Sequence, residues 1–264
     1  MMIGVDAFYL PVSQRVFDST VATESPWGHG LQHGGPPAAL LAYAIETYEP
    51  RPDTAVGRIT LDFFGPIPQG RISVATEVLR PGRKVELVEA TLTVGGRVCV
   101  VARAWRIATA TDTTTPVPAQ PVAPTPLPPP QEQAYLSGVG PGWGYGRAVE
   151  WRFAKGGYAE PGPATVWARP RIPLVAGAPT SGLQRTLTVA DSINGVSAEL
   201  EVTDWLFIPP TLTVTAYRQP EGEWILLDAT TTVASVGTGM AHATLSDAAG
   251  EFGVATQPLL VQRR

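Results

Sequence analysis

The 264-residue chain contains few side chains suited to nucleophilic or metal chemistry, because it has only three histidines and one cysteine. No Cys/His cluster has the spacing of a metal site, and neither a Gly-x-Ser-x-Gly elbow nor a P-loop is present. The most informative stretch is His33-Gly34-Gly35, which two prolines and a long apolar run follow. If a helix begins there, its first amides lack intrahelical acceptors and are suited to binding an oxyanion. These residues are therefore a candidate binding element.

The residues after Gly35 predict a helix that is apolar on nearly all sides and extends to about Tyr48. Pro36 and Pro37 are tolerated in the first turn of a helix, whose amides have no intrahelical acceptor. The preceding glycines let another segment or a ligand approach the backbone closely. A helix without a polar face must be enclosed on all sides. We expect a strongly curved antiparallel sheet to enclose it.

The two halves of the chain repeat one order of elements. In the first half, the helix precedes strand-like segments with a period of two at 58–64, 71–79, 84–94 and 97–107. In the second half, a helix-like segment at 183–200 precedes similar segments at 211–218, 223–235, 239–247 and 251–262. Gly95-Gly96 between two apolar runs predicts a hairpin turn. A duplicated α+β unit explains this repeated order.

A proline-dense and almost uncharged segment separates the halves at residues 109–133. Proline at this density disfavours helices and sheet interiors and favours extended polyproline II. We therefore predict a semi-rigid linker. The predicted organisation is an N-terminal unit at 1–110, the linker at 111–134 and a C-terminal unit at 135–264.

The composition and charge of the chain argue against some classes of binding partner and indicate a cellular compartment. The formal net charge is −4, so we expect no nucleic acid partner and no binding to anionic membranes. No apolar run reaches the ~18 residues of a membrane-spanning helix, and the N-terminus does not resemble a secretory signal. The single cysteine, Cys99, forms no intrachain disulfide, and its alternating surroundings predict a core residue. We expect a reducing, cytoplasmic location.

Several motifs together resemble the double-hotdog acyl-CoA thioesterases of the acyl-CoA thioesterase II family. They are QHGGPPAALLA, VADSING, YRQPEGEWILLDA and DAAGEFGVATQPLLVQ. The resemblance covers roughly residues 20–108 and 145–262. It implies an α+β double hotdog, in which two helix-wrapped antiparallel sheet units form one continuous surface with the helices inside. It also implies hydrolysis of an acyl-CoA thioester to a free carboxylic acid and CoA, as part of fatty acid metabolism.

The resemblance also implies a catalytic set. The family uses an Asp on the helix of the second unit, a Thr near the strand that follows this helix and a Gln on the last strand. These roles map onto Asp191, Gln257 and Thr211 of this sequence, with Thr213 as the alternative threonine. The carboxylate is suited to general-base catalysis on water, or to direct attack that forms a mixed anhydride. The amide and the hydroxyl would hold the water in line.

Substrate contacts are expected from His33, Gly34 and Gly35. The first half has His-Gly-Gly but no acid early in its helix, whereas the second half has the acid without His-Gly-Gly, so we expect one composite site. The acyl tail is expected in an apolar tunnel between the two helices. No metal or cofactor is implied beyond the CoA of the substrate. We favour a homodimer, because edge strands can pair.

Other interpretations stay open at this point. Asp191 could cap a helix that begins at Ser192, Gln257 could face solvent, and Thr211 could be an ordinary strand residue. An acyl-thioester hydratase or dehydratase on the same fold would place His33 and an acid around one tunnel. A non-catalytic acyl-CoA binding module would leave Asp191 facing solvent and Gln257 remote from it.

Overall fold

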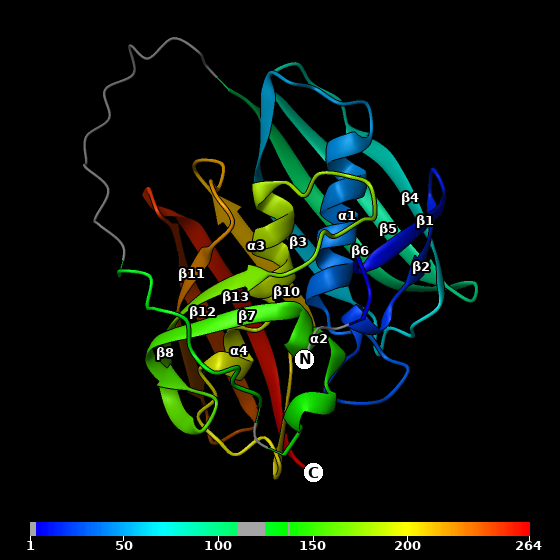
Figure 1. Cartoon of the computed structure of the whole chain (residues 1–264). Helices are drawn as coiled ribbons and strands as arrows, with labels where there is room; N and C mark the ends of the chain where they lie inside the picture. Colours follow the sequence, from blue (N-terminus) through cyan, green and yellow to red (C-terminus); the bar gives the residue numbers. More distant parts are fainter. Residues whose placement is uncertain (1–3, 110–124, 137) are drawn as a thin grey trace.

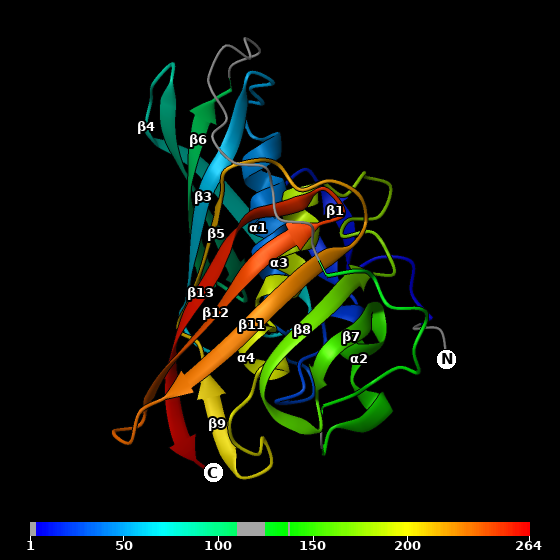
Figure 2. The same cartoon turned by 90° about the vertical axis from the view of Figure 1, so that its left-hand side faces the viewer.

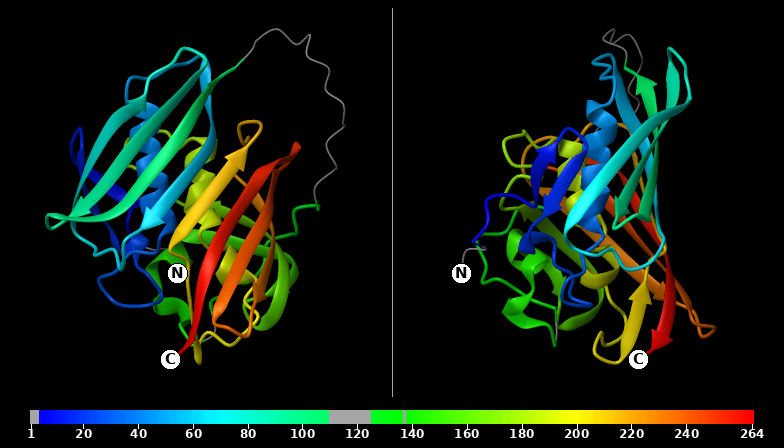
Figure 3. Two further views of the ribbon diagram at one scale, coloured as in Figure 1. Left: turned by 180° about the vertical axis from the view of Figure 1, so that it is seen from behind. Right: turned by 90° about the vertical axis from the view of Figure 1, so that its right-hand side faces the viewer.

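The computed structural model describes residues 4–109, 125–136 and 138–264, which form a 13-stranded sheet curved around the helices (Figure 1; Figure 2). The strand order is β1-β2-β4-β5-β6-β3-β10-β13-β12-β11-β8-β7, and β9 pairs with β13 outside this path. Figure 3 shows the sheet from behind, with the blue-to-green strands of the first unit beside the yellow-to-red strands of the second. Within the described residues, no helix has the length and apolar character needed to cross a membrane.

The N-terminal unit wraps its strands around one long helix. Its elements are β1 (Tyr9–Ser13), β2 (Val16–Ser19), the 3-10 turn η1 (Val21–Thr23), α1 (Gly35–Thr47), β3 (Thr54–Phe63), β4 (Arg71–Arg80), β5 (Val85–Val94) and β6 (Arg97–Ala108). The apolar face of α1 is continuous, and Ala38, Leu40, Leu41 and Ile45 have no exposed surface. The sheet and the second unit enclose the helix, as its composition requires.

The C-terminal unit follows the same plan with a broken helix. Its elements are η2 (Gly140–Gly142), α2 (Gly144–Ala148), β7 (Val149–Gly157), β8 (Glu160–Pro170), α3 (Gly182–Ala190), α4 (Ile193–Val196), β9 (Trp205–Ile208), β10 (Thr211–Ala216), β11 (Ile225–Val233), β12 (Thr238–Asp247) and β13 (Gly250–Arg263).

The two units join edge to edge through β3 and β10. Thr213 of β10 pairs with Thr60 of β3 on one side and with Thr256 of β13 on the other. Side chains alternate along β10, and Leu212 and Val214 are buried toward the helices. This register decides which β10 side chains can reach the interior.

Helices α1 and α3 pack antiparallel, so each end of the pair joins the two units. At one end, a Cβ on Gly35 would lie 2.1 Å from the Thr188 carbonyl oxygen, so only glycine permits this approach. At the other end, Glu46 of α1 accepts hydrogen bonds from Ser181 Oγ at 2.9 Å and from Gln184 Nε2 at 2.6 Å. Ser181 is the N-cap of α3, so the Glu46 carboxylate is hydrogen-bonded to the residue that caps this helix.

The sequence predicted the central elements and missed the flanking ones. The eight predicted strands are confirmed as β3–β6 and β10–β13, and Gly95 and Gly96 turn with φ of +56° and +81°. The single helix predicted at 183–200 is wrong, because α3 ends at Ala190 and the short α4 follows. Strands β1, β2, β7, β8 and β9 were not predicted.

The predicted linker lies largely outside the described residues, which exclude 110–124. The following residues, 125–134, have no regular secondary structure. They run along the second unit, because Arg152 donates to the Pro128 carbonyl at 3.0 Å and Gln131 bonds both backbone groups of Phe153 at 2.8 Å. The predicted unit boundaries stay a prediction.

Candidate active site

Asp191 lies where the helix of the second unit breaks. The helix ends one residue earlier, and the Ser192 amide bonds to the Val189 carbonyl at 3.0 Å in a tightened last turn. The Asp191 carboxylate reaches the start of α1, where the backbone amides of Gly34 and Gly35 lower its pKa. Only 7% of the residue is exposed. The break therefore places the Asp191 carboxyl, which belongs to the second unit, against α1 of the first unit.

Gln257 extends from β13 to the same carboxylate. Its Nε2 donates to Asp191 Oδ1 at 2.9 Å and to the Asp191 carbonyl at 3.3 Å. The side chain is fully buried, and within the described residues its Oε1 has no hydrogen-bond partner. Buried acceptors are normally paired, so this oxygen has room for one further hydrogen bond.

The pKa of the Asp191 carboxyl is raised from 3.8 to about 7, mainly by burial. The backbone amide of Gly34, the hydrogen bond from Gln257 and the backbone amide of Gly35 favour the ionised form and oppose this effect. Because burial dominates, the carboxyl exchanges its proton near neutral pH. Such a group is suited to accept a proton from water and to return it to a leaving group.

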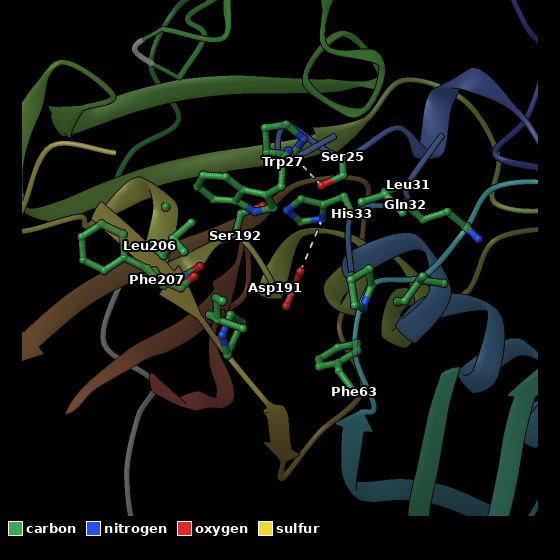
Figure 4. A pocket seen from close by; sticks show the side chains of 18 of the residues that line it. Ser25, Trp27, Leu31, Gln32, His33, Phe63, Asp191, Ser192, Leu206 and Phe207 are labelled. Atoms are coloured by element: carbon green, nitrogen blue, oxygen red, sulfur yellow. Dashed lines mark hydrogen bonds and ion pairs between the residues drawn. The ribbon is translucent and has the colours of Figure 1, made fainter. Parts of the chain in front are cut away.

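His33 faces Asp191 from the loop before α1 (Figure 4). Its Nδ1 lies 3.5 Å from Asp191 Oδ2 and accepts a hydrogen bond from the Gly35 amide at 3.1 Å. The ring stacks on Tyr145, with the ring centroids 3.9 Å apart and the planes 5° from parallel. Burial lowers the pKa of His33 to about 3, so the ring is neutral and its contact with Asp191 is not an ion pair. A neutral imidazole that accepts at Nδ1 carries its proton on Nε2.

Gly34 brings the backbone of α1 against the carboxylate. A Cβ at this position would lie 2.6 Å from Asp191 Oδ2. The φ of Gly34 is −67°, which any residue can adopt, so lack of space rather than backbone conformation requires glycine. The sequence suggested that the Gly34 and Gly35 amides contact substrate. In the structure both glycines lie beside the Asp191 carboxylate, and their contact with substrate stays a prediction.

A cavity of about 350 Å³ opens beside this cluster. Asp191, His33 and Gly34 lie on its wall. The remainder is mostly apolar and comes from both units, including Trp27, Phe63, Ile67, Trp143, Tyr158 and Phe207. Among the described residues that line it, none belongs to α1 or α3, which pack directly against each other. This cavity therefore lies at the ends of the two helices, and the expected position of the acyl tail between them stays a prediction.

The structure does not bring Thr211 into this cluster. Its hydroxyl donates to the Leu61 carbonyl of β3 at 2.7 Å, and the Thr213 hydroxyl lies 3.1 Å from that of Thr60. The alternation along β10 explains this position, because Leu212 is the residue that faces the interior. Within the described residues, Thr211 makes no hydrogen bond to Asp191 and does not line the cavity, so its catalytic role stays a prediction.

The expectation of one composite site is met in its geometry. His33 and Gly34 come from the first unit, while Asp191 and Gln257 come from the second. Sequence reasoning missed Tyr145, which stacks on His33. The signal available for it was the alternation of glycine and aromatic residues in GWGYG at 142–146, a segment otherwise without assignment.

Comparison with known proteins gives matches over most of the chain. The family model of the acyl-CoA thioesterase N-terminal domain matches residues 23–107, and that of the acyl-CoA thioesterase C-terminal domain matches residues 118–261. No match was found among curated proteins.

Solved structures share the whole architecture. A hot dog fold protein of unknown function from Alicyclobacillus acidocaldarius is 17% identical, with a TM-score of 0.72 over 98% of this chain and 97% of that one. The acyl-CoA thioesterase II TesB2 of Mycobacterium marinum is 17% identical, with a TM-score of 0.65 over 97% and 95%. The tesB protein of Mycobacterium avium subspecies paratuberculosis is 15% identical, with a TM-score of 0.67 over 96% and 95%. These likenesses, with the single sheet and its helices, confirm the double hotdog fold.

Proposed function

The chain belongs to the acyl-CoA thioesterase family, and from this premise we propose that Asp191 activates the water that hydrolyses an acyl-CoA thioester. Membership of this family identifies the protein as an acyl-CoA thioesterase. The proposal concerns which residues catalyse the hydrolysis. The observation that supports it most is the buried Asp191 carboxylate, which lies on the cavity wall 2.9 Å from the Gln257 amide.

In the proposed reaction, Asp191 is the general base. It removes a proton from water while the water oxygen attacks the carbonyl carbon of the thioester. The tetrahedral intermediate then expels the thiolate of CoA as the carbon–sulfur bond breaks. The proton held by Asp191 passes to the sulfur, so the products are a carboxylic acid and CoA. Its pKa of about 7 suits both the removal and the return of the proton.

Gln257 has two tasks in this proposal. Its Nε2 fixes Asp191 Oδ1 at 2.9 Å, which sets the direction of the carboxylate. Its Oε1 is buried and lacks a partner within the described residues, so it is suited to accept the second hydrogen of the attacking water. Positioning of this kind contributes through orientation, because the water is held in line with the carbonyl carbon.

Direct attack by Asp191 is the other form of the same proposal. The carboxylate would form a mixed anhydride, which water would then hydrolyse. A single turnover in ¹⁸O-labelled water tests for the anhydride route, because only that route transfers labelled oxygen to the protein carboxyl, and it does so when water attacks the aspartyl carbon. Transfer of label to Asp191 would contradict the general-base route.

One observation favours a second candidate function. His33 and Asp191 lie 3.5 Å apart on one cavity, which is the juxtaposition expected of an acyl-thioester hydratase or dehydratase. Such an enzyme needs an imidazole nitrogen free to take a proton. The Nδ1 of His33 already accepts from Gly35, and the proton of the neutral ring lies on Nε2, so neither nitrogen is a free base. Loss of absorbance from a 2-enoyl-CoA, without thiol release, would favour this candidate.

A binding module without catalysis has less support. That reading would leave Asp191 facing solvent and Gln257 remote from it, whereas the two are buried and joined by a hydrogen bond. The proposal requires no cofactor. A role in fatty acid metabolism and the homodimer stay predictions.

Thiol release from acyl-CoAs of increasing chain length tests the proposal. We expect turnover by the wild type and a loss of at least about a hundredfold in Asp191→Asn, because general-base catalysis contributes about 10²–10⁴. The matched control is Asp228→Asn, which changes an exposed carboxylate on β11 and should retain activity. Full activity in Asp191→Asn would show that the acid is misassigned.

A further inference from the structure

We propose that Tyr145 is a positioning residue of the active site. It keeps Asp191 of the second unit in its position against His33 of the first unit. This inference rests on the proposed function of Asp191. Tyr145 belongs to α2, the short helix that precedes β7, and has no exposed surface.

The ring of Tyr145 holds the imidazole. The two rings are stacked at 3.9 Å with planes 5° from parallel. Trp143 and Trp151 pack around the phenol ring with centroid distances of 5.5 Å and 6.4 Å, which leaves it little freedom to move. Because His33 Nδ1 faces the Asp191 carboxylate, the plane of Tyr145 sets the orientation of that contact.

The hydroxyl of Tyr145 holds the turn that carries the acid. It donates to the Thr188 carbonyl at 2.9 Å and lies 2.9 Å from Ser192 Oγ. A phenol has one hydrogen, which goes to the carbonyl, so Ser192 is the donor in the second bond. Thr188 comes shortly before Asp191 and Ser192 comes directly after it. The hydroxyl therefore fixes the broken end of α3 on both sides of the carboxyl group.

The backbone of α2 is attached to the first unit. The Gly144 amide donates to Glu24 Oε2 at 3.3 Å, and the Tyr145 amide donates to the Glu24 carbonyl at 3.3 Å. A Cβ at Gly144 would lie 1.9 Å from the Val21 carbonyl oxygen, so this contact depends on glycine. Tyr145 thus contacts the first unit through its ring and backbone, and the second unit through its hydroxyl.

The phenol itself is not a reacting group. Both hydrogen-bonding positions of its oxygen are occupied within the protein, and Tyr145 does not lie on the cavity wall. Burial also raises the pKa of its hydroxyl well above the ordinary value of 10.0. Its contribution to hydrolysis is therefore exerted through the residues that it holds in place.

Tyr145→Phe tests the inference, because it keeps the ring against His33 and removes the hydroxyl. We expect kcat for acyl-CoA hydrolysis to fall about tenfold while KM stays within about twofold, since the acid is displaced but the apolar wall of the cavity is unchanged. The matched control is Thr231→Val. It breaks another buried hydroxyl pair of the second unit, Ser197 with Thr231 at 2.8 Å, and should lower the Tm without lowering kcat.

Wild-type kcat in folded Tyr145→Phe would overturn the inference, as would an equal loss of kcat in Thr231→Val. If Tyr145→Phe does not fold, Ser192→Ala decides the question. It removes one of the two partners of the hydroxyl, and an unchanged kcat would again overturn the inference. Absence of thiol release by the wild type would refute the proposed function instead, so the two failures are distinguishable.

Discussion

Asp191→Asn is expected to change how the stability of the protein depends on pH, besides removing activity. In the folded chain, burial raises the pKa of the Asp191 carboxyl from 3.8 to about 7. Between these values the folded state keeps a proton that the unfolded state has lost. Stability falls with pH wherever the folded state binds more protons, so this carboxyl destabilises the fold as the pH rises through that range.

The magnitude follows from the two pKa values. The interval between 3.8 and about 7 corresponds to about 4 kcal/mol, at 1.36 kcal/mol for each pKa unit. This contribution to stability is fully present below about pH 4 and is lost by about pH 8. An Asn side chain does not ionise. Its NH₂ group meets the donors around Asp191 at a cost of about 1–3 kcal/mol, but that cost is the same at every pH.

Urea unfolding of both proteins in small pH steps from about 4 to 8 measures the effect. The difference in unfolding free energy between variant and wild type should change by about 4 kcal/mol over that range, in favour of the variant at high pH. Titrating groups that both proteins share cancel in the difference. A difference that does not depend on pH would refute the reasoning that a buried, protonated Asp191 lies at this site.

The remaining predictions concern the same cluster. The kcat/KM of the wild type should rise with pH around a midpoint of about 7, since the ionised Asp191 is the base; a profile that is flat between pH 5 and 9 would contradict this role. Gly34→Ala should lower kcat at least about tenfold, because its Cβ would lie 2.6 Å from Asp191 Oδ2; wild-type rates would show that the carboxylate has room to move. Gln257→Met, of similar length, should lower kcat by about ten- to a hundredfold and leave KM nearly unchanged, as steady-state assays would record. Thr211→Val should retain kcat within about twofold, because the hydroxyl bonds to Leu61; a loss as large as that of Gln257→Met would restore Thr211 to the catalytic set.

The parts of the fold that the sequence predicted are those set by local pattern. An all-apolar helix must be enclosed, and an alternation with a period of two fixes strands such as β4 and β5. The sequence did not predict strands β1, β7 and β8, which lie at or next to the two ends of the sheet. In addition, β8 contains Pro161, Gly162 and Pro163 in its first half, and these residues are unfavourable in a strand. The break after Ala190 also leaves no local signal, because it depends on contacts with Tyr145 and the other unit.

The site residues likewise divide into features that the local pattern predicts and features that depend on packing. The period of two places Thr211 and Thr213 on one face of a strand but does not say which face is inside, and the burial of Leu212 settles it. The meeting of His33 with Asp191 depends on how the two units pack, which no spacing within either unit encodes. Composition alone also gives no sign that Gly34 lies directly against the Asp191 carboxylate.

The antiparallel helix pair has a consequence for stoichiometry. Each helix presents a carboxylate to the beginning of the other, Asp191 at one end and Glu46 at the opposite end. Two identical protomers would have to keep both ends alike, since every substitution would appear twice. In one continuous chain the ends are free to differ. Here Glu46 accepts hydrogen bonds from Ser181 and Gln184 and links the two helices, while Asp191 borders the cavity. If Asp191 acts as proposed, one polypeptide carries one catalytic carboxylate, and Glu46 holds the two helices together.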